Sequence, residues 1–127
     1  MKALLDSSAW IELLVSGPNS ATFAGPARAA AGVVVPVICL HETFRFVSAN
    51  FGDQVAEDFN RSLMGKEVLP LSAELALEAA RLGRKHGLAL ADSVVYASAL
   101  HSGAELWTQD ADFKGLAHVH YHPKKKA

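Results

Sequence analysis

The chain has 127 residues, of which half are hydrophobic and one fifth are charged. This length and composition are typical of one globular domain with a buried core, and they exclude a disordered chain. The formal net charge is -1, so no overall positive charge indicates a nucleic-acid ligand. An anionic substrate would have to be attracted by a local group of charges or by a bound metal ion.

The sequence also indicates where the protein resides. Its single cysteine, Cys39, lies in a hydrophobic run and has no internal partner for a disulfide. We therefore expect a buried thiol and a reducing, cytoplasmic environment. No hydrophobic run reaches the roughly 18–20 residues that a membrane span needs, and the first residues lack a signal-peptide pattern.

Hydrophobic periodicity and capping residues predict an alternation of short strands and helices. Ser7 or Ser8 would cap the first helix, Ser72 would cap a later one, and Gly87 and Gly103 would end helices. The expected strands cover 2–5, 33–38, 67–71, 105–108 and 117–122, and the expected helices cover 8–16, 20–31, 42–51, 54–64, 73–86 and 89–102.

This alternation predicts an α/β domain with a parallel sheet covered by helices on both faces. In such sheets, functional sites gather at the carboxyl ends of the strands. We expect one domain over residues 1–122, followed by a basic and solvated tail over 123–127 that contains three consecutive lysines.

Acidic residues follow two of the expected strands. Asp6 comes directly after the run Lys2–Leu5, where it could cap a helix, although Ser7 and Ser8 already provide capping hydroxyls. Glu42 stands near the start of an expected helix, where it could interact favourably with the helix dipole or pair with Arg45.

Asp92 is the acidic residue that is hardest to explain by structure alone. It lies in the hydrophobic segment LALADSVVYASAL, without a Lys or Arg one helical turn away. It could be an N-cap if the helix began at Ser93. Otherwise, a carboxylate on a hydrophobic helix needs a partner, because buried charges are rare unless they are paired or bind a cation.

Asp110 and Asp112 follow the last long strand, in the segment WTQDADF. Their side chains would point the same way if the chain stayed extended, whereas an Asp-rich turn is an ordinary alternative. Thr108 could be strand filling or could help to hold a metal-bound water. Several carboxylates that converged without a counter-charge would raise one another's pKa values, and a divalent metal would relieve this repulsion. Metal and carboxylates together indicate phosphate-ester chemistry.

His118, His120 and His122 alternate along the last expected strand, as in some metal sites. A polar face of an edge strand is the favoured interpretation, because neither a cysteine nor a carboxylate lies nearby in the sequence. An oxygen-only set of ligands fits Mg²⁺ or Mn²⁺ rather than zinc.

Taken in order, the segments LLDSSAWIE, HE, LALADSVVYASAL and LWTQDADF resemble the four motifs of the PIN domain, and within it those of VapC-type toxin ribonucleases. The resemblance extends from Met1 to about His122. It implies a three-layer α/β/α sandwich with a central, mainly parallel sheet. It also implies a Mg²⁺-dependent endoribonuclease toxin that cleaves single-stranded RNA, with Mn²⁺ as a possible substitute.

The resemblance further implies a cognate VapB-type antitoxin and a homodimer, with DNA contacted only through the antitoxin. Asp6, Glu42, Asp92 and Asp110 match the acidic quartet of the family, and Asp112 matches a frequent fifth acid. Ser7 and Thr108 match small hydroxyl positions beside the quartet, while His41 departs from the more usual small residue.

Within this scheme, Asp6 and Asp92 are the preferred metal ligands. Glu42, Asp110 and Asp112 would bind a second metal or orient water. Two alternatives stay open: a phosphatase with Asp6 as its nucleophile, and a non-catalytic signalling or binding domain with an acidic pocket. The candidates for RNA contact are Arg45, Arg81, Arg84, Lys85 and Lys114, each of which could equally be a solvated surface residue.

Overall fold

The computed structural model describes residues 1–126 and contains one five-stranded sheet in the order β3-β2-β1-β4-β5, with all neighbours parallel. The strands are β1 (Lys2–Leu5), β2 (Val33–Pro36), β3 (Glu67–Leu69), β4 (Ala104–Thr108) and β5 (Val119–Tyr121). Ala127, the last residue of the predicted tail, lies outside the described residues.

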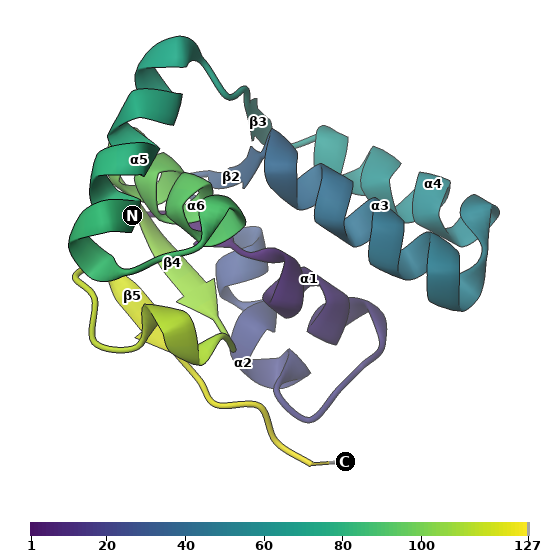
Figure 1. Cartoon of the computed structure of the whole chain (residues 1–127). Helices are drawn as coiled ribbons and strands as arrows, with labels where there is room; N and C mark the ends of the chain where they lie inside the picture. Colours follow the sequence, from purple (N-terminus) through teal and green to yellow (C-terminus); the bar gives the residue numbers. More distant parts are fainter. Residues whose placement is uncertain (127) are drawn as a thin grey trace.

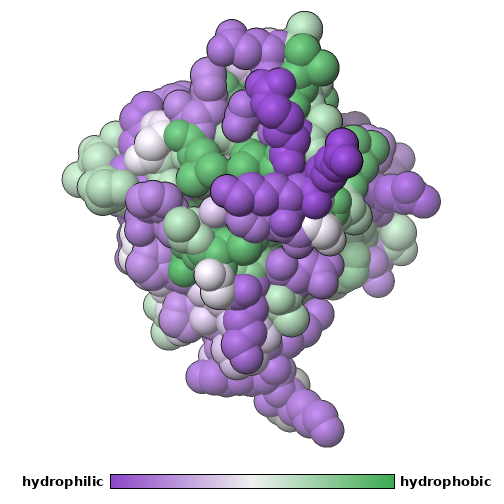
Figure 2. All heavy atoms as spheres, turned by 60° about the vertical axis from the view of Figure 1, so that its left-hand side comes forward, coloured by the Kyte–Doolittle hydropathy of each residue, from purple (hydrophilic) through white to green (hydrophobic). Residues whose placement is uncertain are grey.

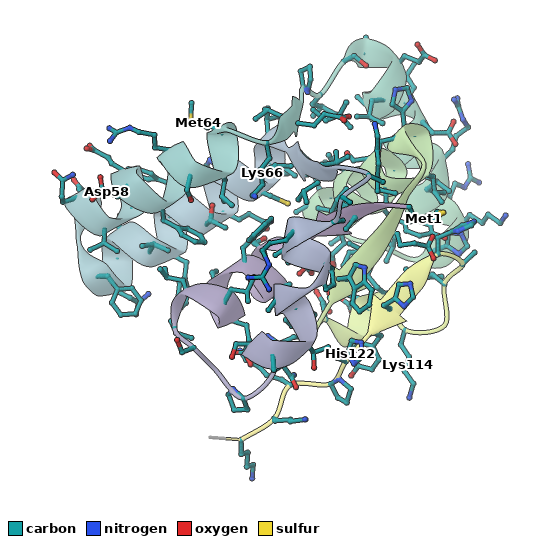
Figure 3. All side chains as sticks on the ribbon, turned by 180° about the vertical axis from the view of Figure 1, so that it is seen from behind. Met1, Asp58, Met64, Lys66, Lys114 and His122 are labelled. Atoms are coloured by element: carbon teal, nitrogen blue, oxygen red, sulfur yellow. The ribbon has the colours of Figure 1, made fainter. Side chains whose placement is uncertain are left out.

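The central strands form the core of the sheet. β1 lies between β2 and β4, with Ala3 opposite Val33 on one side and Leu5 opposite Trp107 on the other. Leu4 and Leu5 are fully buried. Because all strands are parallel, their carboxyl ends meet at one edge of the sheet. Figure 3 shows Met1 at the amino edge and His122 at the carboxyl edge.

Helices cover both faces of the sheet, as the alternation of elements predicts. One face carries α5 (Ala73–His86) and α6 (Leu90–Ser102), and the other carries α1 (Ser7–Leu14), α2 (Ser20–Ala24) and the 3-10 helix η1 (Pro26–Arg28) (Figure 1). The helices α3 (Val37–Phe51) and α4 (Asp53–Met64) pack on each other and extend away from the sheet (Figure 1).

Helix α6 lies between the sheet and α5, which explains its hydrophobic sequence. Every residue from Ser93 to Ala99 is buried. A helix enclosed on several sides needs hydrophobic residues around most of its circumference. Asp92 therefore enters the structure at the first turn of a buried helix, so the alternative in which it caps a helix starting at Ser93 is wrong.

Two predicted helix boundaries are also wrong, and proline is involved in both. The helix expected over 20–31 ends at Ala24 and is followed by η1, because Pro26 has no N–H to continue an α-helix. The helix expected from residue 42 begins at Val37, directly after Pro36. Glu42 consequently lies in the second turn of α3, away from the helix end whose dipole we expected it to meet.

The predicted caps of α5 and α6 are confirmed. Ser72 accepts a hydrogen bond from the N–H of Leu75 at 3.1 Å. Gly87 and Gly103 end the two helices, each with φ of 69°, a conformation that costs glycine little.

The surface is mostly hydrophilic, with hydrophobic side chains between charged ones on the side that carries α5 (Figure 2). Leu77 on this helix is 62% exposed. Over residues 1–126 we find no helix with the length and hydrophobicity to cross a bilayer.

Candidate active site

Five carboxylates lie around the carboxyl edge of the sheet, on four separate segments of the chain. Asp6 joins β1 to α1, Glu42 lies in α3, and Asp92 lies in the first turn of α6. Asp110 follows β4 and begins the 3-10 helix η2 (Ala111–Phe113), which contains Asp112. The parallel topology brings these separated segments together.

Asp6 is buried, and both of its oxygens accept hydrogen bonds. Its Oδ1 accepts from Ser8 Oγ at 2.7 Å and from the N–H of Ala9 at 3.0 Å. Its Oδ2 accepts from Thr108 Oγ1 at 2.5 Å. Asp6 is therefore the N-cap of α1. The expectation that Ser7 and Ser8 would make capping by Asp6 unnecessary is wrong, because the Ser8 hydroxyl donates to this carboxylate.

The pKa of Asp6 reflects a balance of opposing effects. Its net pKa is raised to about 6, chiefly by burial, and the nearby charge of Asp110 acts in the same direction. The hydrogen bonds from Ser8, Thr108 and the Ala9 N–H oppose this rise, because they stabilise the ionised form. The pKa of Asp6 therefore lies near 6, so its carboxyl changes charge within a pH range close to neutrality.

Thr108 links two of the acidic segments. Its hydroxyl donates to Asp6 and accepts from the N–H of Asp110 at 2.9 Å. The side chain is fully buried. Thr108 therefore holds two protein groups through one hydroxyl.

Glu42 accepts a hydrogen bond from the hydroxyl of Ser7, the second of the two hydroxyl residues predicted to lie beside the acidic residues. Ser7 Oγ donates to Glu42 Oε1 at 2.6 Å, across 35 positions of sequence. Glu42 forms no ion pair with Arg45 among residues 1–126, so the pairing that we considered from the sequence is absent there. The bond to Ser7, the residue after Asp6, thus ties the Glu42 carboxylate to the first acidic segment.

The negative charges of all four other acidic residues affect the pKa of Asp92. Its pKa is raised to about 7, mainly by burial and then by the negative charges of Asp110, Asp112, Asp6 and Glu42, in that order of importance. Among residues 1–126, no hydrogen bond to Asp92 opposes this rise. Asp92 is therefore the carboxylate that is most destabilised in its charged form by the convergence of the site.

Asp110 and Asp112 form a turn. Asp110 caps η2, and its Oδ1 accepts from the N–H of Asp112 at 2.9 Å. The extended arrangement that we considered for this pair is wrong. Even so, one carboxylate oxygen from each of Asp92, Asp110 and Asp112 lies within 4.8 Å of the other two. That spacing lets the three side chains share one ion.

This donor set fits a hard divalent cation. Within the described chain, none of the five carboxylates forms an ion pair with Lys or Arg. The charge of the group is thus uncompensated, and oxygen-only ligands are those that Mg²⁺ and Mn²⁺ prefer. Asp92, Asp110 and Asp112 lie close enough to hold the ion directly, whereas both oxygens of Asp6 already accept hydrogen bonds.

The basic residues predicted to contact RNA lie in three places. Arg45 lies one turn after Glu42 and lines a cavity of about 520 Å³ together with Glu42, Phe46 and Ala91. Arg84 and Lys85 are in the last turn of α5, which leads into the start of α6. Lys114 follows η2 directly and is exposed (Figure 3). Arg81 forms a 2.9 Å ion pair with Glu78.

The three histidines contact Glu105 and Trp107, two residues of β4 that are distant from them in the sequence. His118 and His120 contact the two oxygens of Glu105, at 2.8 and 3.2 Å. The rings of His120 and His122 stack on Trp107, with centroid distances of 4.2 and 5.8 Å. This arrangement fits the favoured interpretation of a polar face on an edge strand.

Sequence reasoning missed Ser8 and Gln109 as parts of the site. Ser8 contacts Asp6, and the N–H of Gln109 donates to Ser8 Oγ at 3.2 Å. Ser8 follows the first acidic residue by two positions, and Gln109 directly precedes Asp110. Their proximity to predicted site residues was the available indication, but nothing in the sequence pairs them.

Comparisons with known proteins agree with this fold. The model of the PIN domain family matches residues 3–119. No curated protein sequence gives a significant match.

Solved structures of toxin–antitoxin proteins are similar in fold. A toxin–antitoxin complex from Klebsiella pneumoniae is 24% identical with a TM-score of 0.77, over 93% of this chain and 95% of that one. VapC20 of Mycobacterium tuberculosis, described as a toxin that cleaves the sarcin–ricin loop, is 17% identical with a TM-score of 0.75, over 91% and 95%. VapBC2 of Rickettsia felis, bound to a promoter DNA fragment, is 18% identical with a TM-score of 0.73, over 97% and 98%.

Proposed function

We propose, from the premise that this chain belongs to the PIN domain family, that it is a metal-dependent endoribonuclease and the toxin of a toxin–antitoxin pair. The observation that carries the proposal is the convergence of Asp92, Asp110 and Asp112, which form no ion pair with Lys or Arg among residues 1–126. A raised pKa at Asp92 marks the same place as electrostatically unfavourable without a cation. The substrate would be single-stranded RNA, as the family motifs imply.

The chemistry would be hydrolysis of a phosphodiester bond by water. A bound Mg²⁺ or Mn²⁺ supplies activation of that water and neutralises charge that develops on the phosphate oxygens. Asp92, Asp110 and Asp112 would hold the ion. Glu42, oriented by Ser7, would position the attacking water, and Thr108 would keep Asp6 beside Asp110.

The structure disfavours Asp6 as the nucleophile of a phosphatase. Its side chain is only 6% exposed, and both oxygens accept hydrogen bonds. A nucleophile must reach phosphorus in line with the leaving group, which this buried carboxylate does poorly. The nuclease therefore remains the better use of the same residues.

Part of the proposal concerns partners. The similar solved structures include complexes of VapB and VapC proteins, which supports a cognate antitoxin for this chain. The paired helices α3 and α4 expose large hydrophobic side chains that a partner would cover: Phe44, Phe46, Phe51, Val55 and Met64. We further propose that the chain forms a homodimer, which light scattering of the purified chain would test. We also propose that it resides in the cytoplasm.

The decisive experiment is cleavage of a fluorescent single-stranded RNA by purified protein. We expect cleavage in Mg²⁺ or Mn²⁺ and none in excess EDTA. Asp92→Asn, purified in parallel, controls for contaminating ribonucleases, because only the site differs. Cleavage that continues in EDTA, or that Asp92→Asn retains in full, would contradict the metal-dependent mechanism. A wild-type protein that binds Mn²⁺ but cleaves no RNA would favour a non-catalytic binding domain.

A further inference from the structure

We propose that Asn19, with Glu12 and Gln109, forms a positioning unit that holds Asp6 and the Asp110 turn in the geometry for metal binding. None of the three belongs to the group of carboxylates that could hold the ion. The inference rests on the proposed function, since it concerns the same site, but metal binding tests it separately from cleavage.

Gln109 connects the unit to the acidic site. It stands between Thr108, which holds Asp6, and Asp110, which caps η2. Its backbone N–H donates to Ser8 Oγ, and its side-chain Nε2 donates to the carbonyl of Ser8 at 3.3 Å. The same Ser8 hydroxyl donates to Asp6. Gln109 thus links the end of β4 to the start of α1 through Ser8.

Asn19 holds the side chain of Gln109 from the opposite side. Its Nδ2 donates to Gln109 Oε1 at 2.8 Å and to the carbonyl of Pro123 at 3.0 Å. Both amide hydrogens are therefore used, and the orientation of the amide follows from its two acceptors. Asn19 is only 1% exposed, so losing these bonds would leave buried polar groups without partners.

Glu12 fixes the backbone of Asn19. Its Oε2 accepts from the N–H of Asn19 at 2.7 Å, and the side chain is buried. The loop closes tightly on this carboxylate, because a Cβ atom at Gly17 would lie 2.1 Å from Glu12 Oε1. A side chain at position 17 would therefore displace Glu12 or the loop.

Together these bonds form a continuous polar path from Glu12 through Asn19, Gln109 and Ser8 to Asp6. Burying a carboxylate and two amides costs desolvation energy, which their hydrogen bonds offset. A directional network also fixes orientation, and the groups that orient metal ligands commonly affect metal affinity and activity. Positioning is therefore the role that this network serves best.

The test compares Asn19→Ala and Gln109→Met with wild type, with Gln54→Ala as the matched control for loss of an exposed amide. Glu12→Gln is the conservative variant, since its amide oxygen still accepts from the Asn19 N–H. Mn²⁺ binding is measured by calorimetry, kcat and KM for RNA are measured separately, and thermal unfolding is recorded for each protein.

For Asn19→Ala and Gln109→Met we expect Mn²⁺ affinity and kcat to fall by about tenfold or more, with KM changed little. Gln54→Ala should match wild type, and Glu12→Gln should retain most of the affinity. Folded variants with lower melting points but unchanged Mn²⁺ affinity and kcat would overturn the inference and leave the nuclease intact. If Asn19→Ala does not fold, Gln109→Met carries the test. If the wild-type protein binds Mn²⁺ but does not cleave RNA, the proposed ribonuclease function is rejected. The Mn²⁺ affinities of the variants then still test whether the unit positions the metal ligands.

Discussion

The hydroxyl of Thr108 donates a 2.5 Å hydrogen bond to Oδ2 of Asp6, a residue 102 positions earlier in the chain. The same hydroxyl accepts from the N–H of Asp110. One buried oxygen therefore joins the ends of β1 and β4, the two strands whose carboxyl ends carry acidic residues. This relationship makes Thr108 a sensitive position for the electrostatics of the site.

Thr108→Val should raise the pKa of Asp6 above its value of about 6, because the hydrogen bond that it removes stabilises the ionised carboxylate. The acidic limb of the pH–activity profile should then move to higher pH. We also expect a loss of about 1–3 kcal/mol in stability, since the Asp110 N–H loses its partner. Thr108→Ser keeps the hydroxyl and is the control. An unchanged profile in Thr108→Val would refute this role.

Asp6→Asn separates the capping role of Asp6 from its charge. Asn caps helices about as well as Asp, so the bond from the Ala9 N–H should persist. The amide cannot accept on both sides as the carboxylate does, so we expect a loss of about 1 kcal/mol. Cleavage should fall by orders of magnitude. Melting curves and RNA cleavage measured on one preparation check both, and full activity in a destabilised variant would place Asp6 in the scaffold alone.

Asp92→Asn should abolish cleavage while the metal-free protein gains stability. The substitution removes a charge that burial and four neighbouring acids disfavour. It should also lose most of the rise in melting temperature that Mg²⁺ gives the wild-type protein by binding its folded state. Thermal unfolding with and without Mg²⁺ measures both effects. A variant that is less stable than wild type without metal would show that Asp92 has a structural partner.

The stability of the metal-free protein should decrease as the pH rises from about 4 to about 7. Asp6 and Asp92 have folded-state pKa values of about 6 and about 7, against 3.8 for an ordinary Asp. The folded state therefore binds more protons than the unfolded state in this window, and deprotonation favours unfolding.

Saturating Mg²⁺ should oppose this trend, because protons compete with the ion for the carboxylates. Melting temperatures at pH 5 and pH 8, with EDTA or with Mg²⁺, provide the measurement. Equal melting temperatures at the two pH values in EDTA would indicate that the two carboxyls titrate normally.

The sequence by itself determined the alternation of strands and helices, because hydrophobic periodicity, Ser72 and the two helix-ending glycines act locally. It also identified Asp92 as anomalous, since a carboxylate in a hydrophobic segment is unfavourable wherever that helix packs. Tertiary structure alone decided which carboxylates lie close enough to share an ion, since Asp92 and the Asp110–Asp112 turn meet only when α6 and β4 pack side by side. It likewise decided that Asp6 is a cap with both oxygens occupied, and that Glu12, Asn19 and Gln109 form one network. Hydrogen bonds between residues about 100 positions apart depend on strand order and register, and no local propensity encodes them.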